Sequence, residues 1–181
     1  MMNTPTATQK GLVVVFTGDG KGKTSAAMGV MTRASGHELT VEVIQFLKNP
    51  GRVYGEAISA AKLGVPFNTL GKGFVFNPDK GGDDQQAALD AWERAKEFIL
   101  THESGVLILD EFTYPLIFGW IDAAAVVDWL KTHKPAQLHI VITGRSAPDA
   151  LVAYADMVTE MREIKHPYRL QQIPAQRGID F

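Results

Sequence analysis

A glycine-rich segment between an apolar run and a helical stretch most strongly constrains how this chain can fold. The segment reads Gly18-Asp19-Gly20-Lys21-Gly22-Lys23-Thr24-Ser25 and follows the apolar run Leu12 to Phe16. The order strand, glycine-rich turn, helix predicts a phosphate-binding loop, because backbone N–H groups converge on an anion at the positive end of the helix. In such a loop Lys23 reaches the outer phosphates of a nucleotide, and the Thr24 hydroxyl binds Mg²⁺.

The spacing of this loop differs from the common phosphate-loop pattern. Thr17 stands where that pattern has its first glycine, so the turn begins at Gly18, is one residue shorter, and carries an additional lysine at Lys21. The alternative is an ordinary glycine-rich turn between a strand and a helix, with solvated lysines. The flanking strand and helix favour the phosphate-binding interpretation.

The composition predicts one soluble domain without thiol chemistry. The chain has 181 residues, 45% of them hydrophobic, which is enough for one full core. A formal net charge of −2 gives no electrostatic footprint for nucleic acid or an anionic membrane. Cysteine is absent, which excludes disulfides and cysteine nucleophiles. No apolar run is long enough to span a bilayer and residues 1–10 lack a signal-peptide core, so a cytoplasmic location is expected.

Apolar runs alternate with helical periodicity along residues 11–181, the expected domain, after a flexible N-terminal arm at residues 1–10. This alternation predicts a single α/β domain with a mostly parallel sheet and helices on both faces. The tail from Lys165 to Phe181 is expected to be irregular. Strands are expected at 11–17, 40–46, 65–70, 105–109, 138–143 and 157–161, and helices at 25–35, about 53–61, 83–101, 122–132 and 146–154, the last with a capping box of Ser146 and Asp149.

Polar residues lie at the carboxyl ends of the expected strands. Gln45 ends the second strand, Asp110 and Glu111 follow the fourth, and Arg145 follows the fifth. Ligands collect at this edge of a parallel sheet, so these residues are expected to meet the phosphate-binding loop. One carboxylate would hold Mg²⁺, directly or through water, and the other could bind metal or position a reactant. The alternatives are two acids that cap the next helix, and an Arg145 in a surface ion pair rather than on phosphate oxygens.

Two further features have less specific interpretations. Arg33, Lys165 and His166 could complete an anion pocket. The glycine-rich stretch 71–82 contains Phe74 and Phe76, and such aromatic side chains indicate a docking role unless they pack back onto the core. The residues alone therefore predict a Mg–nucleotide protein with an aromatic loop, and they leave the transferred group open.

Several short motifs follow one another in a specific order after residue 10. They are Thr17 to Thr24, Gln45-Phe46, Gly73-Phe74, Leu109-Asp110-Glu111 with Thr113-Tyr114, Ile142-Thr143-Gly144-Arg145, Lys165-His166 and the ending Gly178-Ile179-Asp180-Phe181. With these motifs the chain resembles the ATP:corrinoid adenosyltransferases of the P-loop type, the CobA/CobO/BtuR group, which share the shortened loop. The resemblance implies a P-loop NTPase-like (RecA-like) fold.

The resemblance also implies a reaction. A corrinoid with cobalt as Co(I), either cobalamin or a precursor such as cobyrinic acid a,c-diamide, attacks the 5′-carbon of ATP, and triphosphate leaves. The implied partners are ATP, Mg²⁺, a second copy in a homodimer and a flavoprotein electron donor. The implied site residues are Gly18 to Ser25, Gln45, Arg145 and Lys165 for the nucleotide, Thr24, Asp110 and Glu111 for Mg²⁺, and Lys23, Glu111, Phe74 and Phe76 for catalysis, with the two rings on the lower face of the corrin. Arg33 is expected to join the nucleotide site because of its charge.

The chain departs from the family pattern at three places. Phe76 stands where the family commonly has tryptophan, Asn77-Pro78 replaces the usual polar pair, and only residues 1–10 precede the first strand. Many relatives have a longer arm that packs over the site of the partner subunit. The other hypotheses are a small-molecule kinase or ATPase on the same sheet, and a corrinoid- or nucleotide-binding module without turnover.

Overall fold

A computed structural model of the chain describes residues 10–48, 51, 54–71 and 82–181. Phe74, Phe76 and all but Lys10 of the expected arm lie outside these residues. The strands are β1 (Val13–Thr17), β2 (Val41–Phe46), β3 (Phe67–Leu70), β4 (Ser104–Asp110), β5 (Gln137–Thr143) and β6 (Met157–Glu160); the helices are α1 (Lys23–Gly36), α2 (Gly55–Lys62), α3 (Gly82–Thr101), α4 (Thr113–Ile117), α5 (Ala123–His133), α6 (Asp149–Tyr154) and α7 (Pro167–Gln171).

The six strands form one sheet in the order β3-β2-β4-β5-β1-β6. Every neighbouring pair is parallel, which confirms the predicted α/β fold. In this register Gln45 of β2 lies opposite Asp110 of β4. Because all strands run the same way, their carboxyl ends meet at one edge of the sheet. None of the helices in the described ranges is long and apolar enough to cross a membrane.

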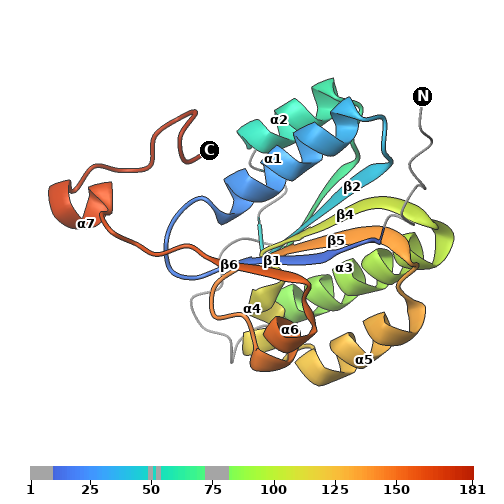
Figure 1. Ribbon diagram of the computed structural model, residues 1–181. Helices are drawn as coiled ribbons and strands as arrows, with labels where there is room; N and C mark the ends of the chain where they lie inside the picture. The colour runs from blue at the N-terminus through green and yellow to red at the C-terminus, as the bar shows by residue number, and fades with distance from the viewer. Residues whose placement is uncertain (1–9, 49–50, 52–53, 72–81) are drawn as a thin grey trace, which may run out of the picture.

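Helices cover both faces of the sheet (Figure 1). α1 and α2 lie on one face, and α3, α5 and α6 lie on the other. Successive side chains of a strand point to opposite faces, so each strand contributes to two core layers. Val14 and Phe16 of β1 pack in the layer that contains Met31 of α1, whereas Val15 packs in the layer that contains Trp92 of α3.

Two short helices and one helix start differ from the sequence-based expectations. α4 and α7 were not predicted, since a five-residue helix is too short for periodicity to reveal. The expected capping box is wrong, because Pro148 rather than Ser146 occupies the N-cap position of α6. Ser146 has a φ of 47° and lies outside the helix.

Candidate nucleotide-binding site

The glycine-rich loop joins the carboxyl end of β1 to the first turn of α1. Gly18 and Gly22 have φ values of 93° and 107°, in the left-handed region that favours glycine. Gly22 is the N-cap of α1, and its carbonyl accepts the first helical hydrogen bond from Ala26 N at 2.8 Å. The N–H groups of the first helical turn have no partner within the helix, so they are available to an anion in the loop.

The end of β6 leaves no room for side chains on two loop glycines. A Cβ on Gly18 would lie 2.5 Å from the Met161 carbonyl oxygen, and a Cβ on Gly20 would lie 2.7 Å from the same atom. Gly20 N also donates to this carbonyl at 2.6 Å. The loop is therefore shaped by a segment that is far away in the sequence.

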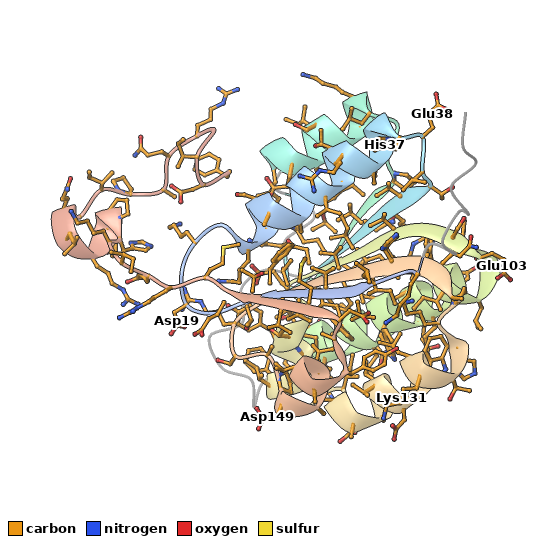
Figure 2. All side chains as sticks on the ribbon, in the orientation of Figure 1. Asp19, His37, Glu38, Glu103, Lys131 and Asp149 are labelled. Carbon is orange, nitrogen blue, oxygen red and sulfur yellow. The ribbon has the colours of Figure 1, made fainter. Side chains whose placement is uncertain are left out.

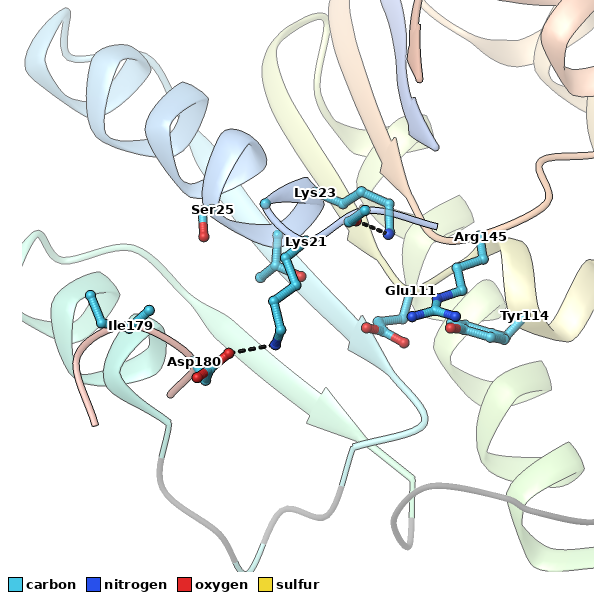
Figure 3. Close-up of a pocket in the computed structure, with 11 residues that line it drawn as sticks. Lys21, Lys23, Ser25, Glu111, Tyr114, Arg145, Ile179 and Asp180 are labelled. Carbon is cyan, nitrogen blue, oxygen red and sulfur yellow. Dashed lines mark hydrogen bonds and ion pairs between the residues drawn. The ribbon is translucent and has the colours of Figure 1, made fainter. Parts of the chain in front are cut away.

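A cavity of about 450 Å³ opens beside the loop (Figure 3). Its walls come from the loop, from the carboxyl ends of β4 and β5, from α4 and from the end of the chain. In Figure 3 the side chains of Glu111, Tyr114 and Arg145 lie together at one side. The lining residues are Gly20 to Ser25, Glu111, Tyr114, Arg145, Ile179 and Asp180.

Asp110 lies at the centre of a buried hydrogen-bond network below the loop. Its carboxylate accepts from Thr24 Oγ1 at 2.9 Å, from Thr143 Oγ1 at 2.6 Å and from Gln45 Nε2 at 2.8 Å. Asp110 and Gln45 are both fully buried. Three donors offset much of the free energy that burial of a carboxylate costs. Gln45 thus contacts Asp110 rather than the cavity, whereas Thr24 lines the cavity and contacts Asp110.

The alternative in which the two acids cap the next helix is wrong. The N-cap position of α4 is occupied by Phe112, which is fully buried. The carboxylate of Asp110 instead binds side chains from α1, β2 and β5. It therefore joins three elements that meet at the carboxyl edge of the sheet.

Glu111 has an unusual backbone and an unusual acidity. Its φ is 64°, a conformation that costs a residue other than glycine about 1–3 kcal/mol. Its N–H donates to Thr143 Oγ1 at 2.9 Å, which holds this conformation. Burial, followed by the charge of Asp110, raises the pKa of Glu111 to about 7. Strained backbone and perturbed acidity occur together at functional sites.

Lys23 lies across the mouth of its own loop. Its Nζ donates to the carbonyl oxygens of Gly18 and Gly20, at 2.7 Å each. Burial, followed by the nearby charge of Arg145, lowers the pKa of Lys23. The ammonium group therefore stands where loop N–H groups and an anion would meet.

A hydrogen bond to its carbonyl holds the backbone of Arg145, and its side chain lines the cavity close to the loop. The Thr113 hydroxyl donates to the Arg145 carbonyl at 2.7 Å, and it would lie 2.0 Å from a Cβ on Gly144. The guanidinium Nη1 lies 3.7 Å from Oδ1 of Asp19. The sequence left open whether Arg145 binds phosphate oxygens or forms a surface ion pair. It forms an ion pair, but its partner Asp19 belongs to the phosphate loop.

Besides Gln45, the predicted residues Arg33 and Lys165 do not line the cavity. Arg33 lies in the last turn of α1, ten residues from its start, which is about 15 Å along the helix. This turn leads to His37, at the opposite edge of the sheet from Asp19 (Figure 2). Lys165 is exposed in the segment between β6 and α7 and is not among the lining residues. Arg33 was assigned from its charge, and Lys165 from its charge and from the Lys165-His166 motif.

Sequence reasoning missed the roles of Thr143, Tyr114, Ile179 and Asp180. Tyr114 and Ile179 line the cavity, and Asp180 forms an ion pair with Lys21. All four belong to the motifs in which the chain resembles the adenosyltransferase family. Membership of these motifs was the one signal in the sequence that could have identified them as site residues. No periodicity or charge pattern distinguishes them from other residues of the same types.

Comparison with known proteins decides the family. A family model described as ATP:corrinoid adenosyltransferase BtuR/CobO/CobP matches residues 9–181. This chain belongs to that family. The corrinoid adenosyltransferase of Sinorhizobium sp. is 40% identical over 175 residues, which cover 96% of this chain and 81% of that protein. The corrinoid adenosyltransferase of Escherichia coli K12 and the corrinoid adenosyltransferase CobA of Salmonella typhimurium are 35% and 33% identical over 173 residues, which cover 96% of this chain and 87% of each relative.

The site of this adenosyltransferase family member suits a magnesium ion whose ligands come partly from the protein and partly from the phosphates of a nucleotide. Among the described residues, no group of three or more acidic or histidine side chains could hold a metal. Mg²⁺ does not need such a group, because it keeps several waters and binds one or two carboxylates together with phosphate oxygens. Gln45 Oε1, beside Asp110, is buried without a partner in the described part of the chain. It could accept a hydrogen bond from a metal-bound water.

Proposed function

We propose that this protein transfers the 5′-deoxyadenosyl group of ATP to the cobalt of a corrinoid and releases triphosphate, as part of cobalamin metabolism. One observation carries the proposal. The Thr24–Asp110 hydrogen bond at the foot of a shortened glycine-rich loop lies in a chain that matches the adenosyltransferase family over residues 9–181. The names of the three relatives support the same activity.

The nucleophile in this reaction is the substrate corrinoid. The electron pair of Co(I) forms a bond to the 5′-carbon, the bond from that carbon to oxygen breaks, and its electron pair leaves with triphosphate. The protein need not supply a nucleophilic side chain, which agrees with a sequence that contains no cysteine. Its task is to bind the polyphosphate and to stabilise the charge that develops on it.

The chain offers several groups for this task. The loop N–H groups, Lys21, Lys23 and Arg145 would bind the triphosphate. Lys23 would exchange its two carbonyl partners in the loop for phosphate oxygens. Thr24 with Asp110 and Glu111 would hold Mg²⁺, which supplies charge compensation for the leaving group. The arrangement stabilises a departing anion, which both this transfer and the competing kinase hypothesis require.

A direct test incubates the protein with MgATP and chemically reduced cobalamin and follows the absorbance spectrum. The proposal predicts the spectrum of an adenosylated corrinoid. In the Lys23→Ala variant the rate should fall about 10²- to 10³-fold, because a preorganised cation beside the leaving group is lost. A spectrum that stays unadenosylated with the wild-type protein would contradict the proposal.

Phe74 and Phe76 lie outside the described residues, and their role remains a prediction from the resemblance. We propose that their rings occupy the lower face of the corrin and keep cobalt without an axial ligand there. Phe74→Ala and Phe76→Ala should spare ATP binding and slow the adenosylation of a Co(II) corrinoid under a mild reductant. Wild-type rates in both variants would show that the rings only fill space.

The remaining family expectations are proposals as well. We propose a cytoplasmic homodimer that receives electrons from a reduced flavoprotein. Family membership supports these expectations. Sedimentation velocity should give the mass of two chains, and a monomer at micromolar concentration would contradict the dimer.

A further inference from the structure

The last six residues form a turn that is closed by its own hydrogen bonds. Asp180 N donates to Gln176 O at 2.8 Å, and Gln176 N donates back to Asp180 Oδ2 at 2.8 Å. Gly178, with a φ of 81°, donates to the Phe181 carbonyl oxygen at 2.7 Å. The Asp180 carboxylate is therefore held in one orientation by local backbone.

This turn contacts the phosphate loop through Asp180. Lys21 Nζ donates to Asp180 Oδ1, the contact drawn as a dashed line in Figure 3. The Lys21 side chain is 55% exposed and that of Asp180 is 14% exposed. Ile179 and Asp180 line both the 450 Å³ cavity and a neighbouring cavity of about 430 Å³. The carboxylate thus lies within the nucleotide site and not merely near it.

The charge of Asp180 opposes that of a bound polyphosphate. The hydrogen bond from Lys21, followed by that from Gln176 N, lowers the pKa of Asp180, so this group is ionised at neutral pH. Lys21 carries one positive charge, and the Asp180 carboxylate that it contacts already neutralises part of it. A phosphate that binds the same ammonium would lie a few ångströms from a fixed carboxylate, and like charges at this separation repel.

We propose that Asp180 competes with triphosphate for Lys21 and thereby promotes the release of triphosphate after adenosyl transfer. This inference rests on the proposed function. Lys21 binds the polyphosphate while the nucleotide is in place and returns to Asp180 when triphosphate leaves. The ion pair between them lowers the affinity for a product that the rest of the loop binds strongly.

Asp180→Asn tests the competition with little change in shape. The amide oxygen can still accept from Gln176 N, while the negative charge is lost. Isothermal titration calorimetry with inorganic triphosphate should show about 3- to 10-fold tighter binding than in the wild type. Affinity for adenosine, which carries no charge, should not change. Triphosphate should also become a stronger product inhibitor of the adenosylation assay.

Further variants separate competition from a structural effect. In a Lys21→Met background, Asp180→Asn should tighten triphosphate binding less than it does when Lys21 is present, because the competition for the ammonium is gone and only the repulsion by the carboxylate remains. Asp128→Asn is the matched control, since Asp128 pairs with Lys131 on the surface of α5 and should leave triphosphate binding unchanged. Asp180→Ala provides a second uncharged variant if Asp180→Asn folds poorly, and thermal unfolding monitors both.

The outcomes distinguish this inference from the proposed function. If the wild type binds triphosphate and both uncharged variants bind it equally or more weakly, the competition is wrong and the adenosyltransferase proposal stands. If the wild type binds neither triphosphate nor MgATP, the proposed function fails, and the role of Asp180 fails with it.

Discussion

At the scale of single residues, Thr143 links the two acids of the site. Its hydroxyl donates to Asp110 Oδ1 at 2.6 Å and accepts from Glu111 N at 2.9 Å. Thr143 is buried at the end of β5. One side chain therefore orients the Asp110 carboxylate and stabilises the left-handed backbone of Glu111. It is a positioning residue, since it acts on the site through its two neighbours.

Thr143→Val should damage the site more than the fold. The substitution keeps the shape but removes both hydrogen bonds, which should lower the free energy of unfolding by about 1–3 kcal/mol. The concentration of Mg²⁺ needed for half-maximal activity should rise, whereas Thr143→Ser should restore both values. Urea unfolding and a Mg²⁺ titration measure the two effects. An unchanged Mg²⁺ requirement in Thr143→Val would show that Thr143 does not position Asp110 for a metal.

Glu111 should make stability depend on pH. Its pKa is raised in the folded protein to about 7, from an ordinary value of 4.5. As far as Glu111 is concerned, the folded protein therefore has its full stability below pH 4.5, where Glu111 is neutral in both states. The free energy of unfolding then falls as pH rises from 4.5 through 7. In metal-free buffer, Glu111→Gln should therefore gain stability over the wild type between pH 5 and pH 8, by about 2–3 kcal/mol at most. Its activity should fall, since the charge is needed in the site. Denaturation curves at the two pH values measure this, and a gap that does not grow with pH would contradict the assignment.

At the scale of elements, the phosphate loop depends on the end of β6. Gly20 N donates to Met161 O, and this carbonyl fills the space that a side chain on Gly20 would need. The glycines are visible in the sequence, but this reason for them is not. It arises from two segments that are separated by most of the chain and become neighbours only in the folded sheet.

Gly20→Ala should distort the loop. Its Cβ would meet Met161 O at 2.7 Å, so either the loop or β6 must move. We expect weaker ATP binding, measured by calorimetry, and a loss of stability of about 1–3 kcal/mol. Gly29→Ala in α1 is the matched control, because no atom lies within 4 Å of its added Cβ. The control should be neutral or up to about 1 kcal/mol more stable, and equal effects of the two variants would contradict the steric explanation.

At the scale of the whole molecule, local sequence patterns predicted the sheet and the helices that cover it. The arrangement of the nucleotide site depends on contacts between residues that are far apart in the sequence. Apolar runs and helical periodicity were sufficient for all six strands of the parallel sheet. Arg33 was wrongly expected at the site, because ten residues of α1 place it about 15 Å along the helix from the loop. Thr143 and Asp180 were missed, since their partners lie far away in the sequence. The order of the motifs made up for part of this, because it predicted the family that the match over residues 9–181 confirmed.

The central claim is that this loop presents ATP so that its whole triphosphate leaves from the 5′-carbon. Phosphorus NMR of the products, after reaction with MgATP and chemically reduced cobalamin, tests it most directly. The claim predicts free triphosphate in equal amount to adenosylated corrinoid. ADP and inorganic phosphate, or unchanged ATP beside unmodified corrinoid, would contradict it.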